Sequence, residues 1–148
     1  MKSRKIAIAS DHAGFYLKEK IVKYLIKEQH EVKDFGCSSE ETVDYTDFAH
    51  PMAYAVSAGE YELGVSICGT GNGMNITVNK HPGVRSALCW NEEVSRLSRA
   101  HNDANVCAMP GWYLSESEAY LIIDKFLATP FEGGRHQKRI DKIPLKIY

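Results

Sequence analysis

The sequence predicts an α/β protein with a three-layer, Rossmann-like fold: a five-stranded parallel sheet with helices on both faces. Short apolar runs alternate with segments of helical periodicity from end to end. Each of the five runs is followed by a helix, and parallel neighbours need such crossover helices. With 148 residues and 44% apolar residues, the chain is long enough for a full core. We therefore expect one domain, 1–148, with 131–148 as a C-terminal arm.

The first two strand–helix pairs occupy residues 5–58. Residues 5–10 (KIAIAS) form a strand-like run, and 14–29 carry apolar side chains at helical spacing. A weaker strand is expected over 31–35. After a polar loop, 46–58 predict the second helix, although Pro51 should bend it or move its start.

The remaining three pairs repeat this pattern. The third strand is the apolar run 63–68, and its helix, 72–80, follows a glycine-rich turn. The last strands are expected at 85–89 and 105–109, and the last helices at 91–100 and 115–128. The glycine pair 133–134 should then break the chain, leaving an arm or short helix at the end.

Composition excludes several classes of function. A formal net charge of -1 gives no reason to expect nucleic acid or an anionic membrane surface as a partner. No apolar stretch is long enough to span a bilayer, and residues 1–5 lack the pattern of a secretory signal. The four cysteines, Cys37, Cys68, Cys89 and Cys107, have neither CxxC nor zinc-type spacing, so nothing demands disulfides. No His, Cys, Asp or Glu spacing suits a metal, so we expect none, and we expect no cofactor. A cytoplasmic location follows as the default.

The most informative segment is 68–73, Cys-Gly-Thr-Gly-Asn-Gly. It follows a buried strand, and its backbone N–H groups can converge on a negative charge. Cys68 lies directly before these donors and before a helix N-terminus, which favours a reactive thiolate. The spacing fits neither the dinucleotide fingerprint nor the P-loop, so a purely structural turn is the alternative, as is a merely packed Cys68. Together, thiol and loop indicate chemistry on a small anionic substrate.

The other cysteines have simpler interpretations. Cys89 and Cys107 lie inside apolar strands and are assigned to the core. Cys37 lies in the polar loop and is expected to be inert.

Two polar segments could join the loop. Asp11 and His12 close the first strand, at the carboxyl edge where ligands of open α/β sheets bind; the alternative is that one of them caps the helix. His101, Asn102 and Asp103 precede the fifth strand and could transfer protons. A loop that enters a strand, however, lies at the opposite edge of its own sheet.

The arm carries Arg135 and Arg139, four residues apart. A helical turn would place both along one face. A solvated basic face is the commoner outcome, but the planar guanidinium suits a phosphate.

Five segments stand together in the order and spacing of one family. They are 8–14 (IASDHAG), 67–73 (ICGTGNG), 79–80 (NK), 101–106 (HNDANV) and 132–139 (EGGRHQKR). The chain resembles the B-type ribose-5-phosphate isomerases, a family that also includes galactose-6-phosphate isomerase subunits. The resemblance extends from Lys5 to about Ile143.

The resemblance implies an aldose–ketose isomerase that interconverts ribose 5-phosphate and ribulose 5-phosphate through a cis-enediolate. Cys68 would be the base, Thr70 and the loop amides would stabilise the oxyanion, and His101, assisted by Asp11, would open the furanose ring. The implied substrate-binding residues are His12, Tyr45, Gly69, Gly71, Asn72, Gly73, Asn102, Arg135 and Arg139. The family implies a homodimer, or a dimer of dimers, in which the His101 loop crosses into the neighbour's site.

Two departures from the family pattern stand out. Trp112 takes a position where many members carry a basic residue near the phosphate, and Thr46 replaces a proline often found after the pair Asp44 and Tyr45. A branch of the family that lacks the cysteine uses a later glutamate; here that position is Met74, so the thiolate version applies.

Other substrates and one other class of function remain open. A six-carbon sugar phosphate, such as allose or galactose 6-phosphate, is the alternative substrate. A non-catalytic sugar-phosphate-binding module would need only the loop and the arginines, so the presence of Cys68, Thr70 and His101 together favours the enzyme.

Overall fold

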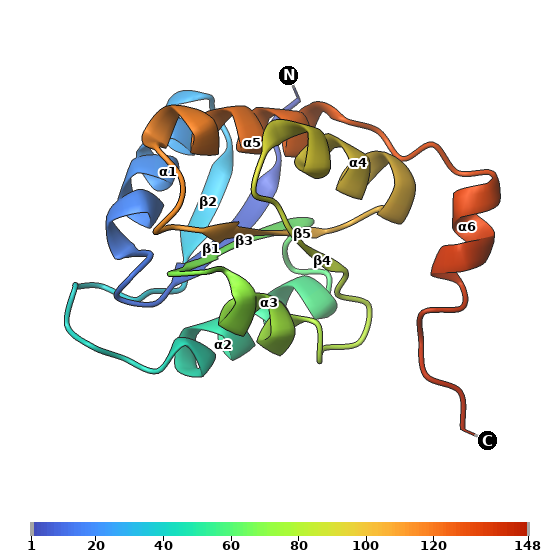
Figure 1. Cartoon of the computed structure of the whole chain (residues 1–148), viewed down its shortest axis with the longest axis horizontal. Helices are drawn as coiled ribbons and strands as arrows, with labels where there is room; N and C mark the ends of the chain where they lie inside the picture. The colour runs from blue at the N-terminus through green and yellow to red at the C-terminus, as the bar shows by residue number, and fades with distance from the viewer. Residues whose placement is uncertain (1, 148) are drawn as a thin grey trace.

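The structure, a computed structural model, describes residues 2–147 and confirms the predicted α/β architecture (Figure 1). Five strands form one sheet in the order β2-β1-β3-β5-β4, and every neighbouring pair is parallel. The strands are β1 (Lys5–Ser10), β2 (Glu31–Asp34), β3 (Leu63–Cys68), β4 (Ser86–Leu88) and β5 (Val106–Pro110). The helices are α1 (Phe15–Lys27), α2 (Tyr45–Ser57), α3 (Asn72–Val78), α4 (Glu92–Asn102), α5 (Glu116–Ala128) and α6 (Arg135–Ile140).

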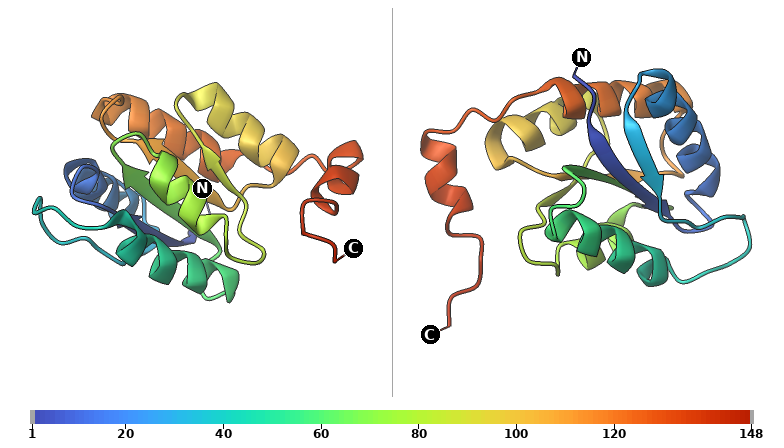
Figure 2. Two further views of the ribbon diagram at one scale, coloured as in Figure 1. Left: turned by 60° about the horizontal axis from the view of Figure 1, so that its bottom comes forward. Right: turned by 180° about the vertical axis from the view of Figure 1, so that it is seen from behind.

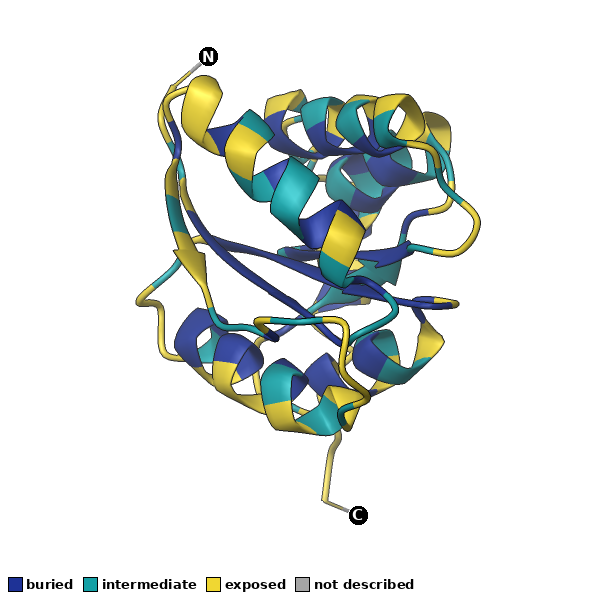
Figure 3. Cartoon of the chain, turned by 90° about the vertical axis from the view of Figure 1, so that its left-hand side faces the viewer, coloured by how far each residue is buried: buried dark blue, intermediate teal, exposed yellow. Residues whose placement is uncertain are grey.

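Helices cover both faces of the sheet (Figures 1 and 2). Helices α1, α4 and α5 form one layer, and α2 and α3 form the other. Side chains of β1 alternate between these layers: Ile6 and Ile8 belong to the core under α1 and α5, whereas Ala7 and Ala9 belong to the core under α2 and α3. Figure 3 shows the central strands buried between the layers, as expected for a parallel sheet. Among residues 2–147, no helix is both long and apolar enough to cross a bilayer.

Two predicted boundaries differ from the structure. Helix α2 runs from Tyr45 to Ser57 with Pro51 inside it, so the proline does not move its start. Helix α4 does not end at Ala100: His101 and Asn102 form its last turn, and the predicted loop is wrong there. The helix ends because Asp103 takes a left-handed conformation with φ of 44°.

The cysteines are free and buried within the described chain. Cys89 and Cys107 are core residues, as predicted. Cys37 is buried as well, although its sequence surroundings are polar, and its thiol donates to the carbonyl of Ser39 at 3.3 Å.

The arm forms the predicted short helix, α6, which stands apart from the two helical layers (Figure 2). The segment that leads into α6 contacts the end of α4, where the amide of Glu132 donates to the carbonyl of Ala100 at 3.0 Å. The glycine pair 133–134 has positive φ at both residues, which turns the chain into α6.

A close backbone contact brings the start of α1 against the end of β3. The amide of Asp11 donates to the carbonyl of Ile67 at 3.3 Å. A β-carbon at Gly14 would meet that carbonyl oxygen and would lie 2.7 Å from the carbonyl carbon. Only glycine allows this approach. It places the start of α1 against Ile67, the residue that precedes Cys68 in the sequence.

We predict that Gly14→Ala lowers the free energy of unfolding by about 1–3 kcal/mol, because the rigid backbone on the other side of the contact cannot move aside cheaply. The control is Gly59→Asn. Gly59 has φ of 77°, which asparagine tolerates, and no described atom lies within 4 Å of a β-carbon built there, so its cost should stay below about 1 kcal/mol. Urea denaturation measures both. Equal losses would show that the contact does not constrain the fold.

Candidate active site

The glycine-rich turn has the predicted form. Strand β3 ends at Cys68, residues 69–71 form the turn, and α3 begins at Asn72. Gly71 takes a left-handed conformation with φ of 78°, and the amide of Asn72 donates to the hydroxyl of Thr70 at 3.3 Å. The turn thereby directs backbone N–H groups toward the end of the strand.

Cys68 lies against these donors but is only 4% exposed. Burial raises the pKa of its thiol above the ordinary value, and the charge of Asp11 raises it further. Backbone N–H groups of Met74, Gly71 and Gly73 act in the opposite direction and favour the thiolate. The predicted donors are therefore present, but the prediction that they favour the thiolate is wrong, because burial outweighs the hydrogen bonds.

Three further predicted residues lie around the turn. The Asp11 carboxylate accepts a hydrogen bond from the amide of Gly14 at 3.0 Å, which confirms a structural role beside any chemical one. The Nδ1 atom of His12 accepts from the amide of Val43 at 3.2 Å, so the neutral ring carries its proton on Nε2, as a donor suited to an anion. The ring of Tyr45 packs over Gly73, 2.7 Å from where a β-carbon would lie.

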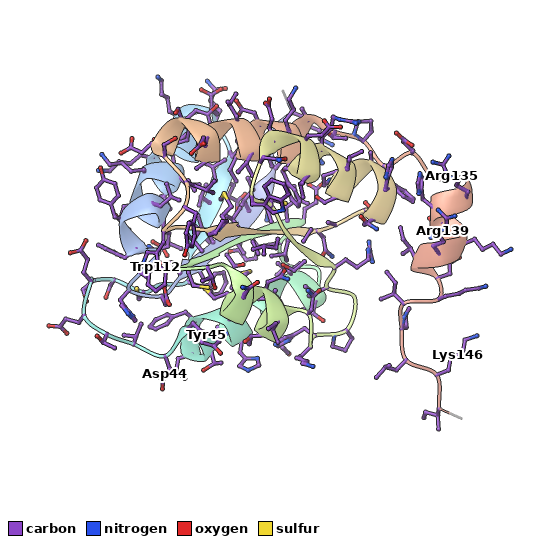
Figure 4. The ribbon with its side chains drawn as sticks, in the orientation of Figure 1. Asp44, Tyr45, Trp112, Arg135, Arg139 and Lys146 are labelled. Atoms are coloured by element: carbon purple, nitrogen blue, oxygen red, sulfur yellow. The ribbon has the colours of Figure 1, made fainter. Side chains whose placement is uncertain are left out.

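The other predicted site residues form a second group, at α4 and the arm. A pocket there is lined by His101, Asn102, His136, Arg139, Ile140 and Ile143. Figure 4 shows Arg135 and Arg139 on the arm, and Trp112 and Tyr45 on the other side of the molecule. The structure thus gathers the predicted residues into two groups rather than one. Asp103 belongs to neither, since it pairs with Arg85 at 3.1 Å and with Arg99 at 3.2 Å.

His101 has two neighbours that the sequence analysis missed. Its ring stacks on that of His136, with centroids 4.3 Å apart and an angle of 14° between the planes. Glu132 lies 3.9 Å from the Nε2 atom of His101 and 3.5 Å from that of His136. The signal available in the sequence was the spacing of four between Glu132 and His136 across the start of a helix.

The geometry of this cluster does not suit a metal ion. The ligand atoms of His101, Glu132 and His136 all lie within 4.8 Å of one another. The two imidazole rings are nearly parallel, however, so their lone pairs run side by side instead of converging. Burial lowers the pKa of His136, and the neighbouring Arg135, His101 and Arg139 lower it further, whereas the Glu132 carboxylate acts in the opposite direction.

Residues 6–143 match the profile of the family described as Ribose/Galactose Isomerase. The chain belongs to this family. It is 43% identical over 140 residues to ribose-5-phosphate isomerase B of Escherichia coli (strain K12), covering 95% of this chain and 94% of that protein. It is also 43% identical over 140 residues to a putative sugar phosphate isomerase of Bacillus subtilis (strain 168), covering 94% of each.

Solved structures of the family share the fold. A ribose 5-phosphate isomerase from Thermotoga maritima matches with a TM-score of 0.94 and 48% identity, over 96% of this chain and 98% of that one. Ribose-5-phosphate isomerase B from Mycoplasma genitalium, solved with bound ribulose-5-phosphate, matches with a TM-score of 0.90 and 44% identity, over 93% of this chain and 92% of that one.

We predict that alkylation of Cys68 by iodoacetamide, followed by site-resolved mass spectrometry, rises with pH to a midpoint above that of a free thiol, because burial raises its pKa. Asp11→Asn should move the midpoint to lower pH, since it removes a negative charge that opposes the thiolate. The control is Glu60→Gln, an exposed carboxylate shortly before β3 begins, which should leave the midpoint unchanged. A midpoint below that of a free thiol would contradict the dominance of burial.

Proposed function

We propose that this protein is an aldose–ketose isomerase that interconverts ribose 5-phosphate and ribulose 5-phosphate, with Cys68 as the base. The observation that carries the proposal is the thiol of Cys68 beside the backbone donors of the glycine-rich turn. A thiolate there would take a proton from carbon while the donors stabilise the oxygen that becomes negative. Family membership and the relative solved with ribulose-5-phosphate support the same chemistry.

In the proposed reaction, His101 with Asp11 first opens the furanose ring, which frees the C1 aldehyde. The Cys68 thiolate then removes the proton from C2, and the electrons of that bond form the C1–C2 double bond of a cis-enediolate while charge develops on the C1 oxygen. Amides of the turn and the Thr70 hydroxyl stabilise that charge. The C1 oxygen takes up a proton and the C2 hydroxyl gives one up, so the net charge is unchanged. As the C2–O bond becomes the ketone, the C1–C2 double bond takes the proton back from Cys68 at C1, which regenerates the thiolate.

The remaining residues would hold the substrate. His12 offers its Nε2 proton to the phosphate, and Arg135 and Arg139 offer guanidinium groups, which bind phosphate in a bidentate manner. Tyr45, over Gly73, and Asn102, in the second group, would contact the sugar.

A shared site would unite the two groups. Cys68 lies at the carboxyl edge of the sheet, whereas His101 ends the helix that leads into β5 and so lies toward the amino edge. The arm stands apart from its own helical layers. We therefore propose a homodimer in which His101 and the arm of one copy complete the Cys68 site of the other.

We predict that Cys68→Ala lowers kcat on ribose 5-phosphate by about 10²–10⁴-fold, the usual cost of removing a general base, while ribose 5-phosphate binding measured by calorimetry persists. Cys37→Ala is the matched control, because it removes another buried thiol and should leave kcat within about twofold. Comparing the kcat/KM of the wild type on ribose 5-phosphate, galactose 6-phosphate and allose 6-phosphate shows whether the substrate has five or six carbons. Binding of all three substrates without turnover by the wild type would identify a binding module instead.

We also predict that two inactive variants restore activity when mixed. Each heterodimer of Cys68→Ala and His101→Asn chains would hold one intact site and one doubly altered site, so the mixture should regain about a quarter of wild-type activity at random pairing of equal amounts. Native mass spectrometry would confirm that subunits exchange. Exchange without recovery would place Cys68 and His101 in the same chain's site and overturn the shared arrangement.

A further inference from the structure

Trp112 is tied to the glycine-rich turn by its backbone. The amide of Gly111 donates to the carbonyl of Cys68 at 2.8 Å, and the amide of Trp112 donates to the carbonyl of Gly69 at 3.0 Å. The bond from Gly111 extends the β3–β5 ladder by one step, because Cys68 pairs with Pro110, and the bond from Trp112 lies in the turn that follows β5. These two backbone bonds hold Trp112 beside the residue that follows Cys68.

The indole ring itself covers the first residue of the turn. A β-carbon at Gly69 would lie 2.7 Å from three ring carbons of Trp112, Cδ2, Cε2 and Cε3, so the ring packs flat over the glycine backbone. The residue nevertheless remains 67% exposed. One face of the indole therefore contacts the turn, and the other faces outward beside the Cys68 site.

A second aromatic ring lies at the other end of the same turn, where Tyr45 packs over Gly73. Figure 4 shows Trp112 and Tyr45 on the same side of the molecule. The two rings bracket the segment whose N–H groups face the thiol, 69–73.

An uncharged aromatic face suits the carbon skeleton of a sugar phosphate better than the phosphate group. It contributes no charge toward a phosphate, but it packs well against the C–H groups of a carbon skeleton. We propose that Trp112 is a specificity-determining residue whose outer face binds the carbon skeleton of the substrate next to Cys68. This inference rests on the proposed function, because it takes the Cys68 site as the place where the sugar binds.

The first test follows the ring directly. The chain has two tryptophans, so Trp90→Phe leaves Trp112 as the only one. Ribose 5-phosphate and unphosphorylated ribose should both change the Trp112 fluorescence of this variant, and inorganic phosphate at equal ionic strength should not. A response to inorganic phosphate as large as that to the sugar would place the phosphate on the ring and overturn the proposal, as would no response to either sugar.

The second test uses kinetics. Trp112→Ala should raise KM by about three- to tenfold with little change in kcat, and kcat/KM should fall by the same factor for ribose 5-phosphate and for ribose. Trp112→Phe should recover part of the loss. The matched control is Tyr113→Ala, an adjacent exposed aromatic whose amide binds Pro110 instead of the turn; it should leave KM unchanged. A loss confined to the phosphorylated sugar would overturn the proposal.

The two tests separate this inference from the proposed function. Fluorescence needs no turnover, so sugar binding at Trp112 is measurable even if the wild type fails to isomerise ribose 5-phosphate. If the wild type isomerises ribose 5-phosphate but neither sugar changes the Trp112 fluorescence, the proposed function holds and the proposed role of Trp112 is wrong.

Discussion

The structure depends most on the backbone at the carboxyl end of β3. Three consecutive carbonyl groups there accept hydrogen bonds from the ends of the two neighbouring strands: Ile67 from Asp11 after β1, and Cys68 and Gly69 from Gly111 and Trp112 after β5. These bonds bring the ends of β1 and β5 to the glycine-rich turn. Because β3 is the central strand of the sheet, the turn is held from both sides, and preorganised donors of this kind need little rearrangement during a reaction.

The same packing creates a conflict at Cys68. A strand end enclosed on both sides excludes water, and burial raises the pKa of the thiol. The N–H groups of the turn act against this effect without overcoming it. A base with a raised pKa is a stronger base once ionised, so the balance between burial and hydrogen bonding sets both how often the thiolate forms and how well it removes a proton.

The second group of polar residues obeys a different constraint. His101 is held by its stack on His136 and by the neighbouring carboxylate of Glu132. The bond from Glu132 to Ala100 fixes the start of the arm against the same helix end. One small cluster therefore positions both the proposed ring-opening imidazole and the arginines of α6. In the proposed dimer, these groups would move together as one unit.

The element order, the parallel sheet, the glycine-rich turn and the family could all be predicted from the sequence, because hydrophobic periodicity and motif spacing are local properties of the chain. It also identified Cys68, Asp11 and His12 as neighbours, since strand ends meet at one edge of a parallel sheet. The folded structure was needed to show that α4 extends through Asn102, that His136 and Glu132 lie against His101, and that Trp112 covers Gly69. These contacts join residues from separate elements, and the raised pKa of Cys68 depends on total burial. Both the contacts and the pKa result from packing between segments that are distant in the sequence, and a local sequence pattern does not specify that packing.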